Sequence, residues 1–188
     1  AMLTAATSLR AGMKPILFLT AVVPPNLDDL RANFLLDHIL GAEVHVIPML
    51  PGMTMADAAV QRAKAAESRI AELEAQGHRC YDIPAGGASP IGGLGFVSGY
   101  VELMDQIQKQ GLEDVDYIVH CSGSGGTLAG LTAGRALVGS NATILSFASG
   151  LKAGEYAADV ASMANSTLAI LGSGPMVKAG DIKFDMGY

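Results

Sequence analysis

The sequence predicts an α/β fold in which short buried strands alternate with longer helices. Short apolar runs that end near Gly, Pro or Ser recur between longer stretches with helical spacing. This alternation is typical of parallel strands joined by helical crossovers. Glycine is also frequent, at 23 of 188 residues, which suggests that helices pack closely on the sheet. We therefore expect a three-layer α/β sandwich with a mostly parallel sheet.

The expected strands are runs rich in Ile, Val, Leu or Phe. They cover residues 15–20, 43–48, 78–84, 115–121 and 142–147, of which 78–84 (HRCYDIP) is the most polar. A last strand-like run, 181–188 (DIKFDMGY), leads toward a loop.

Helices are expected between these strands. They cover residues 3–11, 26–40, 54–77, 91–110, 127–138 and 153–171. Asn26 and Thr54 are predicted N-caps, because their side-chain oxygens can accept from the free N–H groups of a first helical turn. The stretch AGGAS at 85–89 interrupts the pattern, so we expect two α/β segments, 1–85 and 86–188, or one continuous domain.

The composition excludes several classes of function. Half of the residues are apolar and 16% are charged, which is enough apolar material for a core and argues against disorder. The net charge is −6 without a basic cluster, so nucleic acid is not an expected partner. No apolar run approaches the ~18 residues of a membrane span, and no signal pattern opens the sequence, so we expect a cytoplasmic protein without a membrane partner. Cys80 and Cys121 lie in apolar runs and are expected to be reduced core thiols.

The segment 119–134, VHCSGSGGTLAGLTAG, carries the strongest chemical signal. A buried strand enters a turn of small residues that passes directly into a helix, so that several N–H groups and the helix dipole can converge on an anion. The residues expected to bind a phosphate are Ser122, Gly123, Ser124, Gly125, Gly126 and Thr127. A tight turn without a ligand is the alternative.

This turn does not match the common nucleotide or hydrolase motifs. Leu128 stands where a GxGxxG fingerprint needs its third glycine, and no lysine follows in a P-loop frame. Neither serine of the turn lies in a G-x-S-x-G frame.

A second glycine-rich segment, 83–103, begins IPAGGASPIGGLGF. A helix that opens with several glycines loses about 1 kcal/mol for each relative to alanine, so a close neighbour is expected there. That neighbour is either a ligand or another part of the protein. The residues expected to form a wall on the substrate side are Gly86, Gly87, Ser89 and Pro90.

Taken together, these segments resemble the fold-type II pyridoxal-phosphate enzymes, in the branch with D-cysteine desulfhydrase, aminocyclopropane-carboxylate deaminase and L-cysteate sulfo-lyase. The match lies in GGASPIGGLGF at 86–96, SGSGGTLAG at 122–130 and LLDHILGAEVHVIP at 35–48. The resemblance implies a tryptophan-synthase-beta-like fold and pyridoxal phosphate as cofactor, with its phosphate held at Ser122–Thr127. It also implies β-elimination or deamination of a small amino acid.

The resemblance further implies that this chain is truncated at both ends. In the family, the lysine that binds the cofactor covalently lies upstream of the matched region, and further active-site residues lie downstream. None of the six lysines takes that position: Lys14, Lys64, Lys109, Lys152, Lys178 and Lys183. We therefore name no catalytic residue, expect no covalent attachment of the cofactor, and expect the chain to be inactive alone.

The other candidate groups do not form a site in the sequence. The four histidines lack metal-ligand spacing, so no metal is expected. Glu102 and Asp105 share a helical face and are interpreted as solvated. The expected partners are a small phosphate-bearing ligand and either further copies of the chain or a complementing chain. The alternatives to an enzyme segment are a non-catalytic phosphate-binding module and an oligomeric assembly module.

Overall fold

The computed structural model divides the chain into two compact units, residues 1–81 and 82–188. It describes residues 1–26, 28–148, 153–172 and 177–185. Every strand pair within these residues is parallel, which confirms the predicted α/β fold class. Within the same residues, no helix has both the length and the apolar character needed to cross a bilayer.

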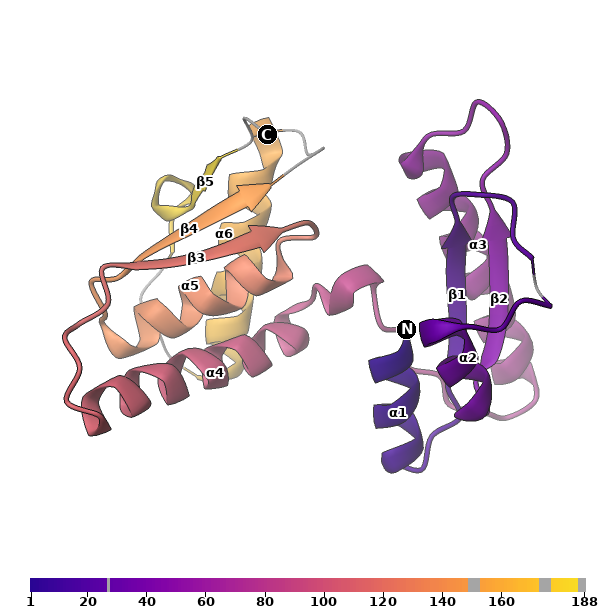
Figure 1. Ribbon diagram of the computed structural model, residues 1–188, viewed down its shortest axis with the longest axis horizontal. Coiled ribbons are helices and arrows are strands. Elements are labelled where there is room, and N and C mark those ends of the chain that lie inside the picture. The colour runs from indigo at the N-terminus through magenta and orange to yellow at the C-terminus, as the bar shows by residue number, and fades with distance from the viewer. Residues whose placement is uncertain (27, 149–152, 173–176, 186–188) are drawn as a thin grey trace. The chain divides into compact units, whose positions relative to one another are not determined.

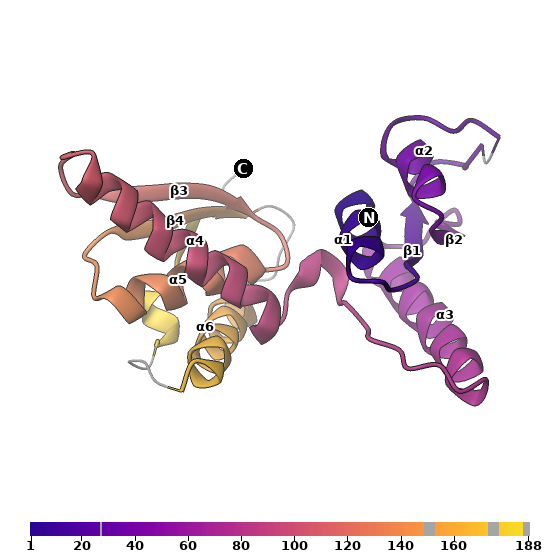
Figure 2. The same ribbon diagram turned by 90° about the horizontal axis from the view of Figure 1, so that it is seen from below.

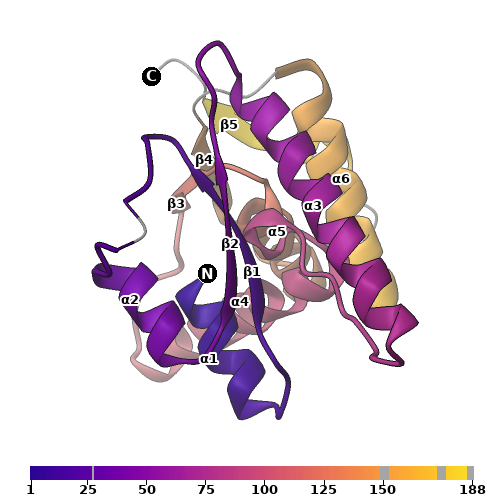
Figure 3. The same cartoon turned by 90° about the vertical axis from the view of Figure 1, so that its right-hand side faces the viewer.

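The first unit, residues 1–81, is a two-stranded parallel sheet with helices on both faces. Figure 3 shows α3 on one side of the strands, and α1 and α2 on the other. The elements are α1 (Met2–Arg10), β1 (Ile16–Ala21), α2 (Ala32–Ile39), β2 (Glu43–Pro48) and α3 (Met55–Ala75).

The side chains of β1 and β2 alternate between these two helical layers, as the period of a strand requires. Thr20 and Glu43 face α3, because both accept hydrogen bonds from arginines on that helix. Leu17 points to the opposite face and is buried. The face toward α3 therefore carries polar side chains beside apolar ones, and the face toward α1 and α2 is apolar.

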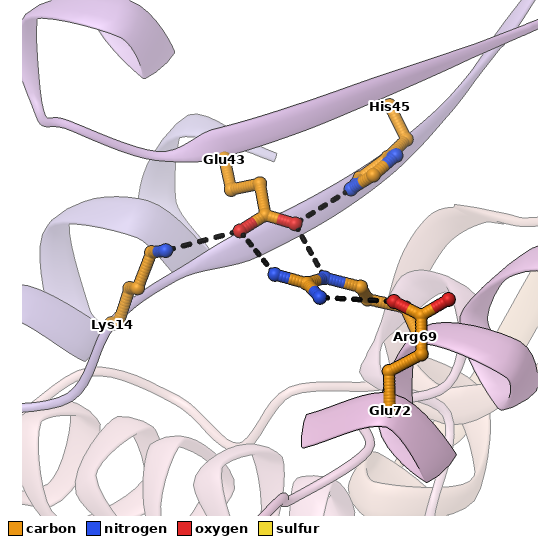
Figure 4. Close-up of polar contacts among 5 residues, drawn as sticks. All are labelled: Lys14, Glu43, His45, Arg69 and Glu72. Carbon is orange, nitrogen blue, oxygen red and sulfur yellow. Dashed lines mark hydrogen bonds and ion pairs between the residues drawn. The ribbon is translucent and has the colours of Figure 1, made fainter. Parts of the chain in front are cut away.

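An ionic network joins β2 to α3 (Figure 4). The Arg69 guanidinium donates to both carboxylate oxygens of Glu43, from Nε at 2.7 Å and from Nη2 at 3.1 Å. Lys14 Nζ lies 3.0 Å from the same carboxylate and His45 Nε2 lies 2.8 Å from it, while Arg69 also reaches Glu72 at 3.0 Å. These contacts, led by the one with Arg69, hold the pKa of Glu43 well below its usual range.

The second unit, residues 82–188, contains a three-stranded parallel sheet in the order β3-β4-β5. Figures 1 and 2 show its long helices α4, α5 and α6 gathered on one face of this sheet. The elements are η1 (Ala85–Gly87), α4 (Pro90–Lys109), β3 (Tyr117–Ser122), α5 (Gly126–Val138), β4 (Thr143–Ala148), α6 (Ala153–Ile170), η2 (Ala179–Asp181) and β5 (Lys183–Asp185).

The core of the second unit lies between the sheet and these helices. Leu128 of α5, Ile144 of β4 and Val160 of α6 are among its buried residues. The other face of β3 is open to solvent, with Tyr117 exposed by 64% and Val119 by 58%.

Neither cysteine belongs to a core, contrary to the prediction. Cys121 is exposed because strand alternation places it on the open face of β3, and Cys80 is only half-buried. An apolar neighbourhood in the sequence did not show which face of the strand would be covered.

Two predicted elements differ from the structure. Residues 78–84 form no strand, because no described strand pairs with them. Helix α2 begins at Ala32 with Arg31 as its N-cap, and not at Asn26. The Asn26 side chain instead accepts from Asp28 N at 3.2 Å, which is a local turn that competes with helix formation. Thr54 does cap α3, in a reciprocal capping box with Asp57.

Candidate functional site

The predicted phosphate turn connects the end of β3 to the start of α5. Ser122 is the last residue of the strand, and the helix begins at Gly126. The N-cap residue is Gly125, with φ +83°, a left-handed conformation that side chains other than glycine adopt at a cost. A glycine has no side chain with which to cap the helix, so the N–H groups of the first turn are left for another acceptor.

The glycine-rich segment of residues 85–90 lies against this turn. A Cβ atom added to Gly86 would stand 2.7 Å from Ser124 Oγ, and one added to Gly126 would stand 3.0 Å from the Cα of Ala88. The first distance is too short for a real Cβ contact, and the second is at the tight end of such contacts. The structure therefore brings together the two segments singled out in the sequence, and it does so at glycines.

The start of α4 is fixed by the residues that precede it. Ser89 is its N-cap and accepts from Gly92 N at 3.1 Å, and Pro90 follows at the first helical position. Gly92 is also packed against the glycine-rich segment before α4, since an added Cβ would lie 2.1 Å from the carbonyl oxygen of Gly87. The predicted wall residues are thus ordered around one tight turn.

Further glycines let α4 and α5 cross at close range. A Cβ added to Gly130 of α5 would lie 2.5 Å from Phe96 Cβ and 2.7 Å from the carbonyl oxygen of Gly93. Gly134, one helical turn further on, would meet Tyr100 Cβ at 2.6 Å. Gly95 has nothing within 4 Å, so helix packing within this unit does not account for it.

A residue that the sequence reasoning missed lies beside the turn. The hydroxyl of Tyr156, on α6, is hydrogen-bonded to Ser122 Oγ. The same ring lies 3.3 Å from the position a Cβ would take at Gly125. Tyr156 is separated from Ser122 by 34 residues, so no local motif could have indicated it.

The histidines and carboxylates outside this turn form no further candidate site. Among the described residues, no group of His, Cys, Asp and Glu could hold a metal ion. Glu102 and Asp105 each bond a side chain one turn along α4: Gln106 at 2.9 Å and Lys109 at 2.6 Å. Neither carboxylate is directed at the phosphate turn by these contacts.

Comparison with known proteins agrees with this geometry. Residues 1–169 match the family model described as pyridoxal-phosphate dependent enzyme. The chain belongs to this family.

Several individual proteins of known name are similar to this chain. A putative 1-aminocyclopropane-1-carboxylate deaminase of Pyrococcus abyssi is 38% identical over 138 residues, or 73% of this chain and 38% of the relative. The 1-aminocyclopropane-1-carboxylate deaminase of Mesorhizobium japonicum is 32% identical, with 96% of this chain and 52% of the relative covered. A D-cysteine desulfhydrase of Klebsiella pneumoniae is 39% identical over 80 residues, or 43% of this chain and 24% of the relative.

A solved structure extends the likeness to three dimensions. A crystal structure of an ACC deaminase homologue matches with a TM-score of 0.77 and 30% identity, and 98% of this chain and 51% of that chain are covered. This chain therefore spans about half the length, or less, of the relatives described here.

Pyridoxal phosphate is the cofactor that this family implies, and its phosphate fits the turn before α5. The fit rests on the left-handed Gly125, on the helix N-terminus that it leaves uncapped, and on the exposed Gly123 and Ser124. A turn of small residues at a helix N-terminus is a geometry that can bind an anion through its N–H groups. The assignment of Ser122–Thr127 to the phosphate and of Gly86–Pro90 to the substrate side stays a prediction.

Proposed function

We propose that this chain carries the cofactor-phosphate site of a pyridoxal-phosphate-dependent lyase or deaminase that acts on small amino acids. The observation that supports it most is the close approach of Gly86 to Ser124, next to the start of α5, which no side chain caps. The printed names of the relatives, 1-aminocyclopropane-1-carboxylate deaminase and D-cysteine desulfhydrase, give the two reaction types that we propose for the whole enzyme.

The residues of the turn would bind the phosphate by hydrogen bonds and by the helix dipole. The N–H groups at Gly126 and Thr127 begin α5, where the dipole favours negative charge. The hydroxyls of Ser122, Ser124 and Thr127 can each donate one hydrogen bond. When bound, pyridoxal phosphate supplies an electron sink for carbanion chemistry, and the protein supplies orientation.

We further propose that these residues bind the cofactor without turning substrate over by themselves. A lysine that attacks a carbonyl must be desolvated or lie next to another cation, because its ordinary pKa keeps it protonated. Within the described residues every lysine is exposed: Lys14, Lys64, Lys109, Lys178 and Lys183. Lys14 and Lys109 are also engaged by carboxylates.

The proposed partner is a further copy of this chain or a complementing chain, which would cover the open face of β3. The exposure of Tyr117 and Val119 supports a covering surface, because large apolar side chains on one sheet face are usually buried. The alternative, a phosphate-binding module without chemistry, is supported by the same exposed lysines.

The test is binding of pyridoxal phosphate to the full chain with and without a carboxylate in the turn. The variant is Gly123→Asp, since an added Cβ at Gly123 meets nothing within 4 Å. Gly125 suits the test less well, because its φ of +83° and its contact with Val160 would strain any side chain. The matched control, Gly123→Asn, has nearly the same size without the charge.

A ligand that binds only the folded protein raises its unfolding free energy, by about 2.7 kcal/mol at a hundredfold excess over Kd. We expect pyridoxal phosphate to stabilise the wild type and Gly123→Asn, and to have no effect on Gly123→Asp. Equal stabilisation of Gly123→Asp would place the phosphate elsewhere.

Borohydride reduction followed by peptide mapping tests the second half of the proposal. We expect no single lysine to be labelled stoichiometrically in this chain. A lysine labelled only when the turn is intact would contradict catalytic incompleteness.

A further inference from the structure

Tyr156 is tied to the phosphate turn from outside the motif. It is 8% exposed and extends from the first turns of α6. Its hydroxyl is hydrogen-bonded to Ser122 Oγ, and its ring also packs edge-on against Phe184 of β5, with centroids 5.2 Å apart. Tyr156 thus connects the phosphate turn to α6, and its ring also contacts β5 of the sheet.

The same ring supports the residue that caps α5. A Cβ at Gly125 would lie 3.3 Å from Tyr156 Cε2 and 3.6 Å from its hydroxyl oxygen, with Val160 Cγ2 at 2.9 Å. Tyr156 is therefore hydrogen-bonded to Ser122, where the strand ends, and its ring fills the space that a side chain at Gly125 would need.

Once an anion is bound, the chemistry of the two hydroxyls decides which of them donates the hydrogen bond and which accepts it. Each hydroxyl has one proton and can accept through its lone pairs. A phosphate has strong acceptors, so the serine proton is best used on the phosphate. Tyr156 can then donate its own proton to Ser122 Oγ, which fixes the rotation of the serine hydroxyl and strengthens it as a donor.

We propose that Tyr156 is a positioning residue of the phosphate site, which orients the Ser122 hydroxyl. This inference rests on the proposed function, since it assumes that Ser122 faces the phosphate. Tyr156 itself does not need to touch the ligand.

A second buried tyrosine provides the matched control. Tyr100 of α4 is 0% exposed, and its hydroxyl has no hydrogen-bond partner among the described residues. It packs against Gly134 and not against the turn. Removing this hydroxyl changes core polarity without altering the proposed site.

The experiment compares Tyr156→Phe and Tyr100→Phe in the full chain, by titration calorimetry with inorganic phosphate and with pyridoxal phosphate. Loss of one positioning hydrogen bond should weaken both ligands by about three- to tenfold in Tyr156→Phe. Tyr100→Phe should bind both ligands as the wild type does. Phenylalanine keeps the ring that packs on Phe184, so the fold should persist in either variant.

A double-mutant cycle with Ser122→Ala separates positioning from a general structural effect. If Tyr156 acts through the serine, Tyr156→Phe should cause little further loss in phosphate affinity once Ser122 is alanine. Full additivity of the two losses would overturn the inference.

The remaining outcomes are distinguishable. Unchanged affinity in Tyr156→Phe, with a wild type that binds phosphate, would overturn the role of Tyr156 and leave the proposed function standing. A wild type that binds neither phosphate nor pyridoxal phosphate would overturn the proposed function itself, and the inference with it.

Discussion

The two units of this protein attach a helix to its neighbours in different ways. In residues 82–188, α4 and α5 approach until only glycine fits, as at Gly130 against Phe96. In residues 1–81, α3 is joined to its sheet by charged side chains, with Arg69 bonded to Glu43. The contact between α4 and α5 depends on the small volume of glycine, and the contact between α3 and its sheet depends on the charges of Arg69 and Glu43.

This difference follows the distribution of buried apolar surface. The second unit buries a continuous cluster that includes Leu128, Val160 and Leu168, whereas the buried apolar residues in the described part of the first unit are Ala5, Pro15, Leu17 and Ala58. A small unit with little core depends more on polar contacts. The glycine-packed unit also carries the candidate site, where geometry must be fixed most closely.

The largest expected effect tests the close helix crossing. Gly130→Ala places a methyl group 2.5 Å from Phe96 Cβ, so the helices must separate, and we expect a loss of about 3 kcal/mol in unfolding free energy. The control is Gly95→Ala, where the methyl meets nothing within 4 Å and the gain in helix propensity is up to about 1 kcal/mol. Urea denaturation measures both. Equal effects of the two substitutions would mean that α4 and α5 are further apart than described.

The next effect tests the ionic attachment of α3. Glu43→Gln removes the charge that Arg69, His45 and Lys14 share, and we expect a loss of about 2 kcal/mol from the first unit. Asp105→Asn, which breaks an exposed pair with Lys109, should cost at most about 0.5 kcal/mol. Hydrogen exchange read by mass spectrometry assigns each loss to its unit. A Glu43→Gln variant with wild-type protection in α3 would contradict the network.

The same network predicts a dependence on pH. The folded-state pKa of Glu43 is depressed, so its stabilising contribution is complete above its unfolded pKa of ~4.3 and is lost as the pH falls further. Acid should therefore open residues 1–81 progressively below about pH 5, and Glu43→Gln should flatten that dependence.

A smaller effect concerns a buried carboxylate of the first unit. Asp37 is 1% exposed, and neither of its carboxylate oxygens has a hydrogen-bond partner in the described structure. Asp37→Asn replaces a buried carboxyl group that lacks a partner with an amide of nearly the same size, and we expect a gain of about 1 kcal/mol. Asp57→Asn should instead destabilise, because that carboxylate completes the capping box of α3. Thermal unfolding of both variants measures the signs, and a loss in Asp37→Asn would reveal a partner for Asp37.

Much of the fold could be predicted because its signals are local. Four strands appear within two residues of their expected positions, since a short apolar run bounded by turn residues identifies a buried strand. The Thr54 cap was also visible, because a cap and its partner lie three residues apart. The exception, residues 78–84, shows the limit, because strand-like residues form a strand only where another strand pairs with them.

The sequence by itself determined the α/β class and the glycine-rich turn before α5, because glycine spacing and hydrophobic period act over a few residues, and its motifs resembled those of the family. Only the tertiary structure decided which residues lie against that turn and which charges hold each helix. Gly86 meets Ser124, Tyr156 meets Ser122 and Arg69 meets Glu43 across 26 or more residues. Contacts at such separation depend on how the chain folds back on itself, which no local pattern records.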